Sequence, residues 1–317
     1  MAAPRISVIV VTDRYTTIRR ALASLRSQTA RGEMELVIVI PTGLRDGDDV
    51  VSLDADFAAV KLVQIPTIHP MPAARAAGIR AATAPIVFLG ETHSFPAPGF
   101  MEALLECHQG DWDMVVPGFV NANPENSLSW AAFLIDYGTW LSALPAGVTG
   151  GGPTWNVAYR KSLLEEADSR LELAMEHGDE MAEWLRERGV RVFFQPDARL
   201  EHANISMSKW WIEQRFLCGM LVANARRKRW GLGKRLLYVA GSPLIPFVIV
   251  YRLRDALARL RSRGELRGAM LPALLIGAAV RTAGEVVGYT RGASDGAQER
   301  MDHYELHKLQ FTRMTPA

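Results

Sequence analysis

The stretch IVFLGETHSFPAPGF, residues 86–100, decides the fold of this chain. Its first four residues, Ile86–Leu89, are apolar and predict a buried strand, and the glycine behind them ends it. A polar cluster follows, and two prolines and a glycine then turn the chain into a helix predicted over Phe100–Cys107. Open α/β sheets bind ligands beyond the carboxyl ends of their strands, where Glu91 and His93 fall. An acid and an imidazole there suit a divalent cation held against a phosphate, although an ordinary polar loop is the alternative.

Length and charge narrow the class of protein. The chain has 317 residues, enough for one large domain or two smaller ones, and a formal net charge of +2, which argues against a dedicated nucleic-acid binder. Cys107 and Cys218 form neither a disulfide framework nor a CxxC metal pair, which indicates a reducing cytoplasm. We expect no signal peptide, because the first apolar run is short and is followed by charges.

Upstream of the central stretch, strands and helices alternate. β-Branched residues predict a first strand over Ile6–Val11, and an amphipathic helix follows from about Thr17. A second strand is predicted over Leu36–Ile40 and a short third over Val60–Gln64. An Ala-rich helix over Ala73–Ala82 then leads into the central strand. This order predicts an α/β fold with a parallel sheet and helices on its faces.

Several stretches, taken in order, resemble family-2 glycosyltransferases of the GT-A fold. The N-terminal ones are SVIVVTDRYTTIRRALASLRSQT, ELVIVI, AARAAGIRAATAPIVFL and ETHSFPAPGFMEALL. Four later ones resemble parts of a bacterial, membrane-associated branch of that family: NANPENSLSWAAFLIDYG, GGPTWNVAYRKSLL, WLRERGVRV and QPDARLEHANIS. The resemblance covers roughly residues 5–204 and rests on the order of these stretches. It implies a mostly parallel sheet flanked by helices.

The resemblance also implies a reaction. A sugar would pass from a nucleotide-sugar, with a UDP-sugar as the first choice, to an acceptor hydroxyl with inversion at the anomeric carbon. The charge of the departing diphosphate must be neutralised, normally by Mn²⁺ or Mg²⁺ on an Asp-x-Asp motif. A carboxylate must accept the proton of the acceptor hydroxyl. The expected acceptor is a glycan or a lipid-linked sugar of a cell-surface polysaccharide.

The Asp-x-Asp position is the main departure from the family. It reads Glu91, Thr92 and His93, whereas relatives in the branch read Glu-Asp-His. Glu91 and His93 remain as metal ligands, and His202 in RLEH matches a recurrent histidine that approaches the metal or the pyrophosphate. The alternatives are that Arg75 neutralises the charge instead, or that metal affinity and activity are lost.

The donor site is expected at the ends of the first strands. Thr12, Asp13 and Arg14 lie where the family cradles the base, and Arg75 lies where it often has a basic residue facing the donor. Each of the charged residues has a structural alternative. Asp13 is also an acid at a helix N-terminus, and Arg75 is also readable as a surface side chain.

The second strand of the family normally ends in an acid that contacts the nucleoside. Here Pro-Thr-Gly at 41–43 replaces it. Asp46 or Asp48 would be the substitute, and a solvated acidic turn is the alternative. The missing acid motivates a competing hypothesis, a catalytically degenerate relative that binds a nucleotide-sugar or glycan without turnover.

A glycine-rich loop, GGGPTWN at 150–156, is the next candidate for substrate binding. Its three glycines permit a close approach of the backbone to a ligand, and Trp155 is suited to stacking on a sugar or base. We therefore expect Gly152, Trp155 and Asn156 to bind substrate, with Asn156 bonding a sugar hydroxyl. The alternative is a flexible hairpin whose tryptophan belongs to the core.

The resemblance places the catalytic base near the start of the helix that precedes Gly189. Asp179 is the predicted base, Glu180 is next, and Glu176 is the fallback. The alignment with the family must be shifted by one or two residues, because the usual position of the acid falls on residues 177–178. The alternative is that these acids simply complement the helix dipole.

Beyond Asn204 the sequence changes character. Basic and aromatic residues cluster at 208–211 and 226–235. Two apolar runs follow: 236–251, which Pro243 and Pro246 break, and 269–280, which Arg281 ends. Neither run cleanly reaches the ~20 residues of a spanning helix. They predict two short helices or a re-entrant hairpin at the cytoplasmic face of an anionic bacterial membrane. The alternative is a helical domain that packs on the catalytic domain or on a second subunit in a homodimer.

We therefore expect a GT-A domain over residues 1–225 and a basic, apolar helical segment over 226–317. The remaining alternative is a structural protein, a membrane-surface scaffold. This alternative leaves Glu91, His93 and Trp155 without a role. A nucleotidyltransferase on a similar sheet is disfavoured, because VTDRYTT after the first strand contains no glycine.

Overall fold

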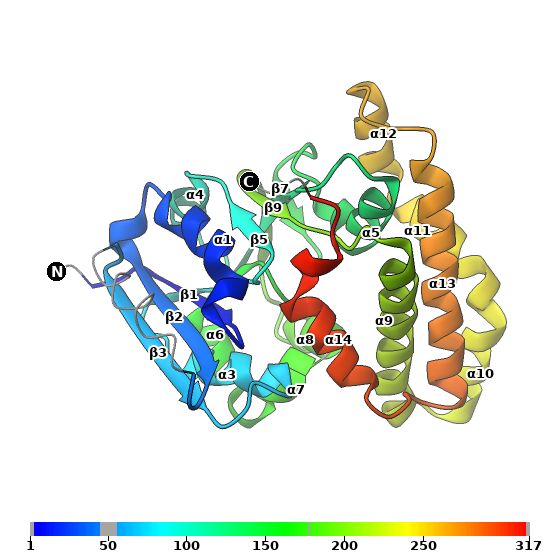
Figure 1. The fold of residues 1–317 in the computed structure, drawn as a ribbon, viewed down its shortest axis with the longest axis horizontal. Helices are drawn as coiled ribbons and strands as arrows, with labels where there is room; N and C mark the ends of the chain where they lie inside the picture. The colour runs from blue at the N-terminus through cyan, green and yellow to red at the C-terminus, as the bar shows by residue number, and fades with distance from the viewer. Residues whose placement is uncertain (1–2, 45–55, 177, 315–317) are drawn as a thin grey trace. The chain divides into compact units, whose positions relative to one another are not determined.

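Runs of aliphatic and β-branched residues form the strands of one mixed sheet in the computed structural model, which describes residues 3–44, 56–176 and 178–314 (Figure 1). Within these residues the sheet has nine strands in the order β3-β2-β1-β4-β8-β6-β9-β5, and β7 pairs with β9. Their bounds are Ile6–Val11 (β1), Met34–Pro41 (β2), Ala59–Ile65 (β3), Ile86–Leu89 (β4), Ser94–Pro96 (β5), Met114–Asn121 (β6), Gly147–Thr149 (β7), Ala158–Arg160 (β8) and Val192–His202 (β9). β1 to β4 are parallel, and β8 runs antiparallel to β4 and β6.

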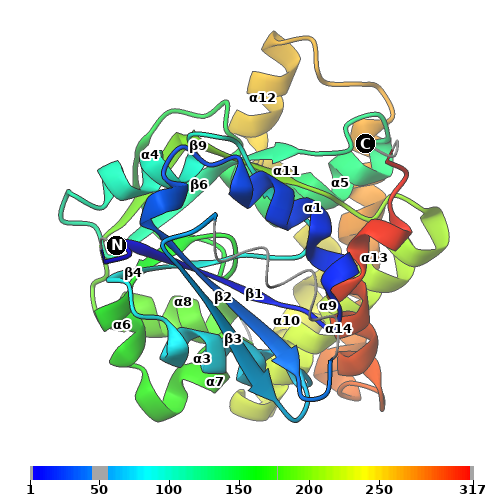
Figure 2. The same cartoon turned by 60° about the vertical axis from the view of Figure 1, so that its left-hand side comes forward.

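Short helices connect these strands. They are Tyr15–Arg26 (α1), Met71–Ala81 (α3), Phe100–Cys107 (α4), Lys161–Glu165 (α6), Leu171–Glu176 (α7) and Gly178–Glu187 (α8). Figure 2 shows α1 and α3 on either side of β1, β2 and β3. Gly78 of α3 is needed for this packing, because a Cβ there would lie 2.5 Å from the Ile9 side chain of β1. The predicted α/β architecture is confirmed, and β1 and α4 have the predicted bounds.

The chain divides into two compact units. Unit 1 comprises Met1–Val120 and Pro145–Glu201, and therefore holds most of the sheet; unit 2 comprises Asn121–Leu144 and His202–Ala317. The predicted boundary at residue 225 lies inside a helix of unit 2, Ser208–Arg229 (α9). The functional division into 1–225 and 226–317 stays a prediction.

Unit 2 is helical, as the sequence predicts for the C-terminal segment. Besides α9 it contains Ser127–Tyr137 (α5), Leu232–Gly241 (α10), Ile245–Arg252 (α11), Arg254–Ser262 (α12), Met270–Thr290 (α13) and Ala297–Leu306 (α14). α9 and α13 pack with their backbones in close contact, since a Cβ on Gly219 would lie 1.9 Å from the Arg281 carbonyl oxygen. The buried guanidinium of Arg215 donates two 2.7 Å hydrogen bonds to the carboxylate of Asp136, which ties α9 to α5.

Among the described residues, two helical stretches are long and apolar enough to cross a membrane by length and composition alone. They are Leu232–Arg252, with a mean hydropathy of 1.3, and Met270–Thr290, with 1.5. The first is broken into α10 and α11, as expected, and almost none of its residues are buried. The second differs from expectation, because it continues through Arg281 as one helix, with that guanidinium 3.6 Å from Glu285.

Candidate active site

Glu91 lies just beyond the C-terminal end of β4, the parallel strand of unit 1 that borders antiparallel β8. Its side chain is only 4% exposed. The backbone of the 150–156 loop is tied to this strand end, because the Asn156 amide donates to the Leu89 carbonyl at 2.7 Å. Asn156 adopts a left-handed conformation, with φ of 61°, and its side-chain amide donates to Glu91 Oε2 at 2.6 Å. Asn156 was expected to bond a sugar hydroxyl; the structure shows its side chain bonded to Glu91, and its role toward a sugar stays a prediction.

Arg75 reaches the same carboxylate from helix α3. Its guanidinium lies 3.8 Å from Glu91 Oε1 and 3.6 Å above the centre of the Trp155 ring. The side chain of Arg75 is 11% exposed, so the interpretation as a surface arginine is wrong. Trp155 is half-buried and stacks on Arg75. The positive charge of Arg75 is thus held beside Glu91 by stacking on Trp155, a residue from a distant part of the sequence.

His93 completes the cluster in unit 1. The ring is fully buried, with Nε2 at 3.3 Å from Glu91 Oε2 and Nδ1 at 3.3 Å from the Thr92 hydroxyl. The adjacent Ser94 hydroxyl is buried and has no hydrogen-bond partner in the described part of the chain. A carboxylate and an imidazole are ligands that Mn²⁺ accepts, so the donor set fits the implied cation.

The residues expected to bind the nucleotide base of the donor lie at the end of β1. Thr12 is buried, and its hydroxyl donates to the carbonyl of Arg14 at 2.6 Å. Asp13 accepts from the Thr17 hydroxyl at 3.3 Å and from the Arg14 guanidinium at 3.2 Å. These contacts support the start of α1, so Asp13 has the structural role that was the alternative. They leave its binding role a prediction.

The packing of the loop on the sheet requires a glycine at position 152. A Cβ at this position would lie 2.4 Å from the Val116 side chain of β6 and 2.6 Å from Met114. Its neighbours Gly150 and Gly151 face open space. The close approach that requires a glycine at 152 is therefore made to the sheet, and a role of Gly152 toward substrate stays a prediction.

Several predicted residues are not tested by the structure. Asp46 and Asp48 lie outside the described residues, as do His177 and the side chains of Glu176 and Asp179. Glu180 is half-buried in α8. The identity of the catalytic base therefore stays a prediction.

His202, the last residue of β9, is buried in a polar network of unit 2. Its Nδ1 lies 2.9 Å from Asn204 Oδ1, and its ring centre lies 4.5 Å from that of Tyr137. Asn204 donates in turn to Asn121 Oδ1 at 3.0 Å. Apart from His202, the residues of this network were not predicted from the sequence; the signal for them was the pair of similar stretches NAN and HAN, residues 121–123 and 202–204.

The sheet, with its buried charged cluster at the strand ends, places the protein in the GT-A class of glycosyltransferases. The family model described as Glycosyl transferase family 2 matches residues 7–167, about half of the chain. The chain belongs to this family and is a nucleotide-sugar-dependent glycosyltransferase. A search of curated protein sequences finds no match.

Solved structures show the same fold. A mannosyltransferase from Pyrobaculum calidifontis, in complex with GDP-Man and Mn²⁺, is 19% identical over 89% of this chain and 88% of its own, with a TM-score of 0.52. GalNAc-T7 with UDP, GalNAc and Mn²⁺ is 16% identical over 63% of this chain and 43% of its own, with a TM-score of 0.48. At such low identity the likeness of the mannosyltransferase concerns the fold.

Proposed function

We propose that this protein transfers a sugar, with inversion, from a nucleoside-diphosphate sugar to a hydroxyl of a glycan or lipid-linked acceptor at a membrane surface. The observation that carries the proposal is the placement of Glu91. It is buried at the ligand-binding edge of the sheet and contacts Arg75, His93 and Asn156. Such a concentration of charged and titratable groups at a strand end is typical of a catalytic site.

In this proposal Glu91, His93 and His202 hold Mn²⁺ or Mg²⁺. The bound cation would neutralise negative charge on the departing diphosphate. His202 is included because it matches a recurrent histidine of the family, and its role stays a prediction. Arg75 adds a fixed positive charge, and Trp155 stacks on the base or sugar of the donor. A UDP-sugar is the first donor to test, and GDP-mannose is the second because the mannosyltransferase neighbour binds GDP-Man with Mn²⁺.

Inversion needs a base that takes the proton from the acceptor hydroxyl. We assign this role to Asp179, with Glu180 as the substitute. Asp179→Asn is expected to abolish transfer while leaving donor binding intact, and Glu180→Gln serves as its neighbouring comparison. Comparable transfer by wild type and both variants would remove these two acids from the mechanism.

A thermal-shift panel tests the donor site. UDP, GDP, dTDP and CMP are compared with and without Mn²⁺ or Mg²⁺, and transfer or donor hydrolysis is measured in the same samples. We expect one nucleotide to raise the melting temperature only with metal, because a ligand that binds the native state stabilises it. The shift should disappear in Glu91→Gln and His93→Ala and persist in Glu106→Gln, which changes an exposed acid of α4. A metal-dependent shift without turnover would favour the degenerate relative, and no shift in buffer, detergent or lipid would refute the donor site.

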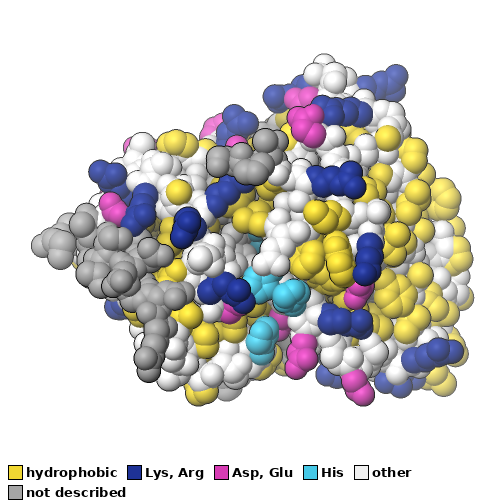
Figure 3. All heavy atoms as spheres, in the orientation of Figure 1, with side chains coloured by type: hydrophobic (Ala, Val, Ile, Leu, Met, Phe, Trp, Pro, Cys, Tyr) yellow, Lys and Arg dark blue, Asp and Glu magenta, His cyan; other side chains and the backbone are white. Residues whose placement is uncertain are grey.

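The membrane part of the proposal rests on α10 and α11 of unit 2. Figure 3 shows apolar side chains gathered over this part of the molecule. The largest exposed ones on these helices and the turn between them are Leu232, Leu236, Leu237, Leu244, Phe247 and Tyr251. Basic residues precede them at 226–229. An apolar face beside basic residues is typical of a helix lying in an anionic membrane surface.

Flotation with vesicles tests this attachment. We expect the protein to float with vesicles containing anionic lipid and to sediment when Leu237 and Phe247 are both changed to Glu. Val148→Glu is the matched control, since Val148 is 74% exposed and belongs to unit 1. If the double variant floats normally, or if it loses a homodimer in lipid-free buffer, the apolar face serves another purpose.

A further inference from the structure

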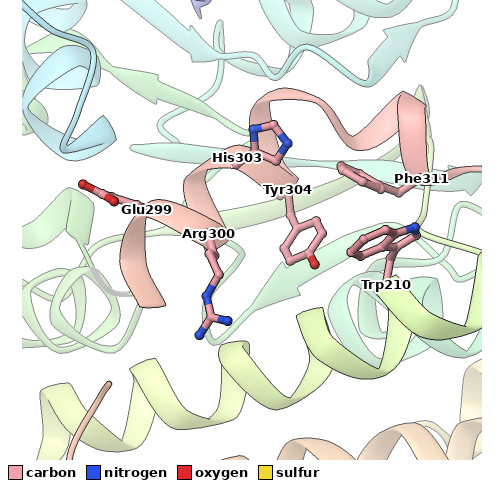
Figure 4. Close-up of a pocket in the computed structure, with 6 residues that line it drawn as sticks. All are labelled: Trp210, Glu299, Arg300, His303, Tyr304 and Phe311. Atoms are coloured by element: carbon pink, nitrogen blue, oxygen red, sulfur yellow. The ribbon is translucent and has the colours of Figure 1, made fainter. Parts of the chain in front are cut away.

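Unit 2 contains a pocket to which the donor chemistry assigns no role. It has a volume of about 270 Å³. It lies between the start of α9, helix α14 and the short helical turn Lys308–Phe311 that follows α14 (Figure 4). Its lining residues are Trp210, Glu299, Arg300, His303, Tyr304 and Phe311. All six belong to unit 2, so the pocket is defined by that unit alone.

Aromatic rings form one wall of this pocket. Phe311 is central to them, with its ring centre 5.0 Å from that of Tyr304, 5.5 Å from that of Trp210 and 5.9 Å from that of His303. The Tyr304 and Phe311 rings meet edge to face at 73°. Inclined rings of this kind offer flat apolar surfaces to a ligand. Trp210 and Phe311 are half-buried and His303 is exposed, so the wall is accessible.

The rest of the lining is polar and balanced in charge. Glu299 and Arg300 come from the same helix as Tyr304; in Figure 4 Arg300 lies beside Tyr304, and Glu299 lies farther from the rings. Arg300 donates to Glu213 at 3.3 Å. Burial and a hydrogen bond to Glu213 raise the pKa of Tyr304 to about 12, so its hydroxyl stays neutral at physiological pH. One acid and one base in the lining do not select an ion of either sign.

We propose that this pocket binds a pyranose ring of the acceptor saccharide, with the apolar face of the sugar on Trp210 and its hydroxyls toward Glu299 and Arg300. The inference rests on the proposed function, which requires a glycan acceptor. A flat aromatic surface with a few polar groups beside it is the environment that a ring with one apolar face and a rim of hydroxyls requires. The pocket is slightly smaller than the ~300–1,000 Å³ of sites for drug-sized ligands, which suits one or two sugar rings better than a nucleotide-sugar.

An ammonium cation is the main competitor, because aromatic rings also bind cations. The position of Lys209 disfavours it. The Lys209 ammonium already lies 4.2 Å above the Trp210 ring and would repel a second positive charge there, whereas the charge of Arg300 is offset by Glu213 and Glu299. A neutral polyhydroxy ligand meets no such penalty.

Saturation-transfer NMR on the full chain tests the assignment. The probes are methyl glycosides of mannose, glucose, galactose and N-acetylglucosamine, with tetramethylammonium chloride as the cation probe. We expect at least one glycoside to bind wild type, and about tenfold weaker binding or none in Trp210→Leu, because the flat ring is lost. Ile212→Ala is the matched control, since Ile212 is 49% exposed on the same helix and does not line the pocket. Phe311→Leu is a second variant, with melting temperatures recorded for all of them.

Two results would overturn the saccharide site. One is that no glycoside binds wild type; the other is that a glycoside binds Trp210→Leu and Phe311→Leu as well as it binds wild type. Binding of tetramethylammonium in preference to the glycosides would replace it with a cation site. Nucleotide shifts measured on the same samples separate the two proposals. A lost glycoside signal with an intact nucleotide shift supports the pocket, whereas an absent nucleotide shift in wild type counts against the donor site only.

Discussion

Two buried glutamates of unit 1 lie at opposite ends of its parallel strands, and they differ in what surrounds them. Glu35, the second residue of β2, is fully buried at the N-terminal end of the strands. Glu91 lies beyond the C-terminal end of β4 and is nearly as buried. Each is close to one cationic side chain, Lys61 at 2.8 Å for Glu35 and Arg75 at 3.8 Å for Glu91. Burial and a charged neighbour therefore do not distinguish a structural carboxylate from one that is proposed to bind a metal.

The partners of the two carboxylates make the distinction. Glu35 accepts hydrogen bonds from the Ser7 hydroxyl and, at 2.7 Å each, from the amide and hydroxyl of Thr83. These groups join the starts of β1, β2 and β4, so they hold the sheet together. Glu91 instead contacts an imidazole and an arginine that is itself stacked on a tryptophan. Only the second set contains groups that suit a cation and a phosphate.

The largest expected effect is on catalysis at Glu91. Glu91→Gln keeps the shape and removes the charge, so transfer or donor hydrolysis should fall on the order of a hundredfold. The unfolding free energy should change by less than about 1 kcal/mol, because the amide can still accept from Asn156. Steady-state kinetics and urea unfolding measure the two quantities. Full activity in this variant would contradict the assignment of the site.

Glu35→Gln should show the opposite pattern. Burial alone would raise the pKa of the Glu35 carboxyl, but hydrogen bonds from Lys61, Ser7 and Thr83 outweigh burial and lower the pKa from 4.5 to about 2. The lowered pKa corresponds to about 3 kcal/mol of stability at neutral pH. Glu35→Gln should lose most of it, measured as the free energy of unfolding in urea. The activity of the folded protein should be retained. The control is Glu33→Gln, because Glu33 forms an exposed ion pair with Arg5. This change should lower the free energy of unfolding by less than about 1 kcal/mol.

The same carboxylate predicts a dependence of stability on pH. A group whose pKa is lower in the folded state contributes its full stability above its unfolded pKa and loses it as the pH falls toward the folded pKa. For Glu35 this window runs from 4.5 down to about 2. Melting temperatures of wild type should therefore fall through this window more steeply than those of Glu35→Gln. Parallel curves for the two proteins would mean that Glu35 is not the group responsible.

Local sequence patterns were sufficient to predict most of the sheet. β1 and α4 have the predicted bounds, because an unbroken apolar run and a turn of prolines and glycine define them without distant contacts. β2 and β3 extend one or two residues beyond their predicted ends. Glu35 was passed over, since one acid at the start of an apolar strand gives no local signal that Lys61 and Thr83 will meet it.

The arrangement of the active site depends on pairings that no local pattern contains. Glu91 and Asn156 are 65 residues apart, and they meet because antiparallel β8 enters the sheet beside β4. The stacking of Arg75 on Trp155 follows from the same insertion. In unit 2, α13 runs through Arg281 because close packing on α9 accommodates a charge that a hydropathy pattern treats as a break. The residue types were thus predictable, whereas their partners required the folded chain.

The smallest expected effect concerns Arg75, the cationic neighbour of Glu91. Arg75→Lys keeps the positive charge but loses the flat guanidinium that covers Trp155 while it reaches Glu91. The loss of one cation–π contact is worth about 1 kcal/mol, so we expect the KM for the donor to rise about fivefold, with little change in melting temperature. Arg188→Lys is the matched control, since its guanidinium lies 4.3 Å from the centre of the Trp184 ring, also in unit 1. If both variants raise the KM equally, the effect is a general consequence of losing such a contact; if only Arg75→Lys does, the position of Arg75 beside Glu91 is what the donor requires.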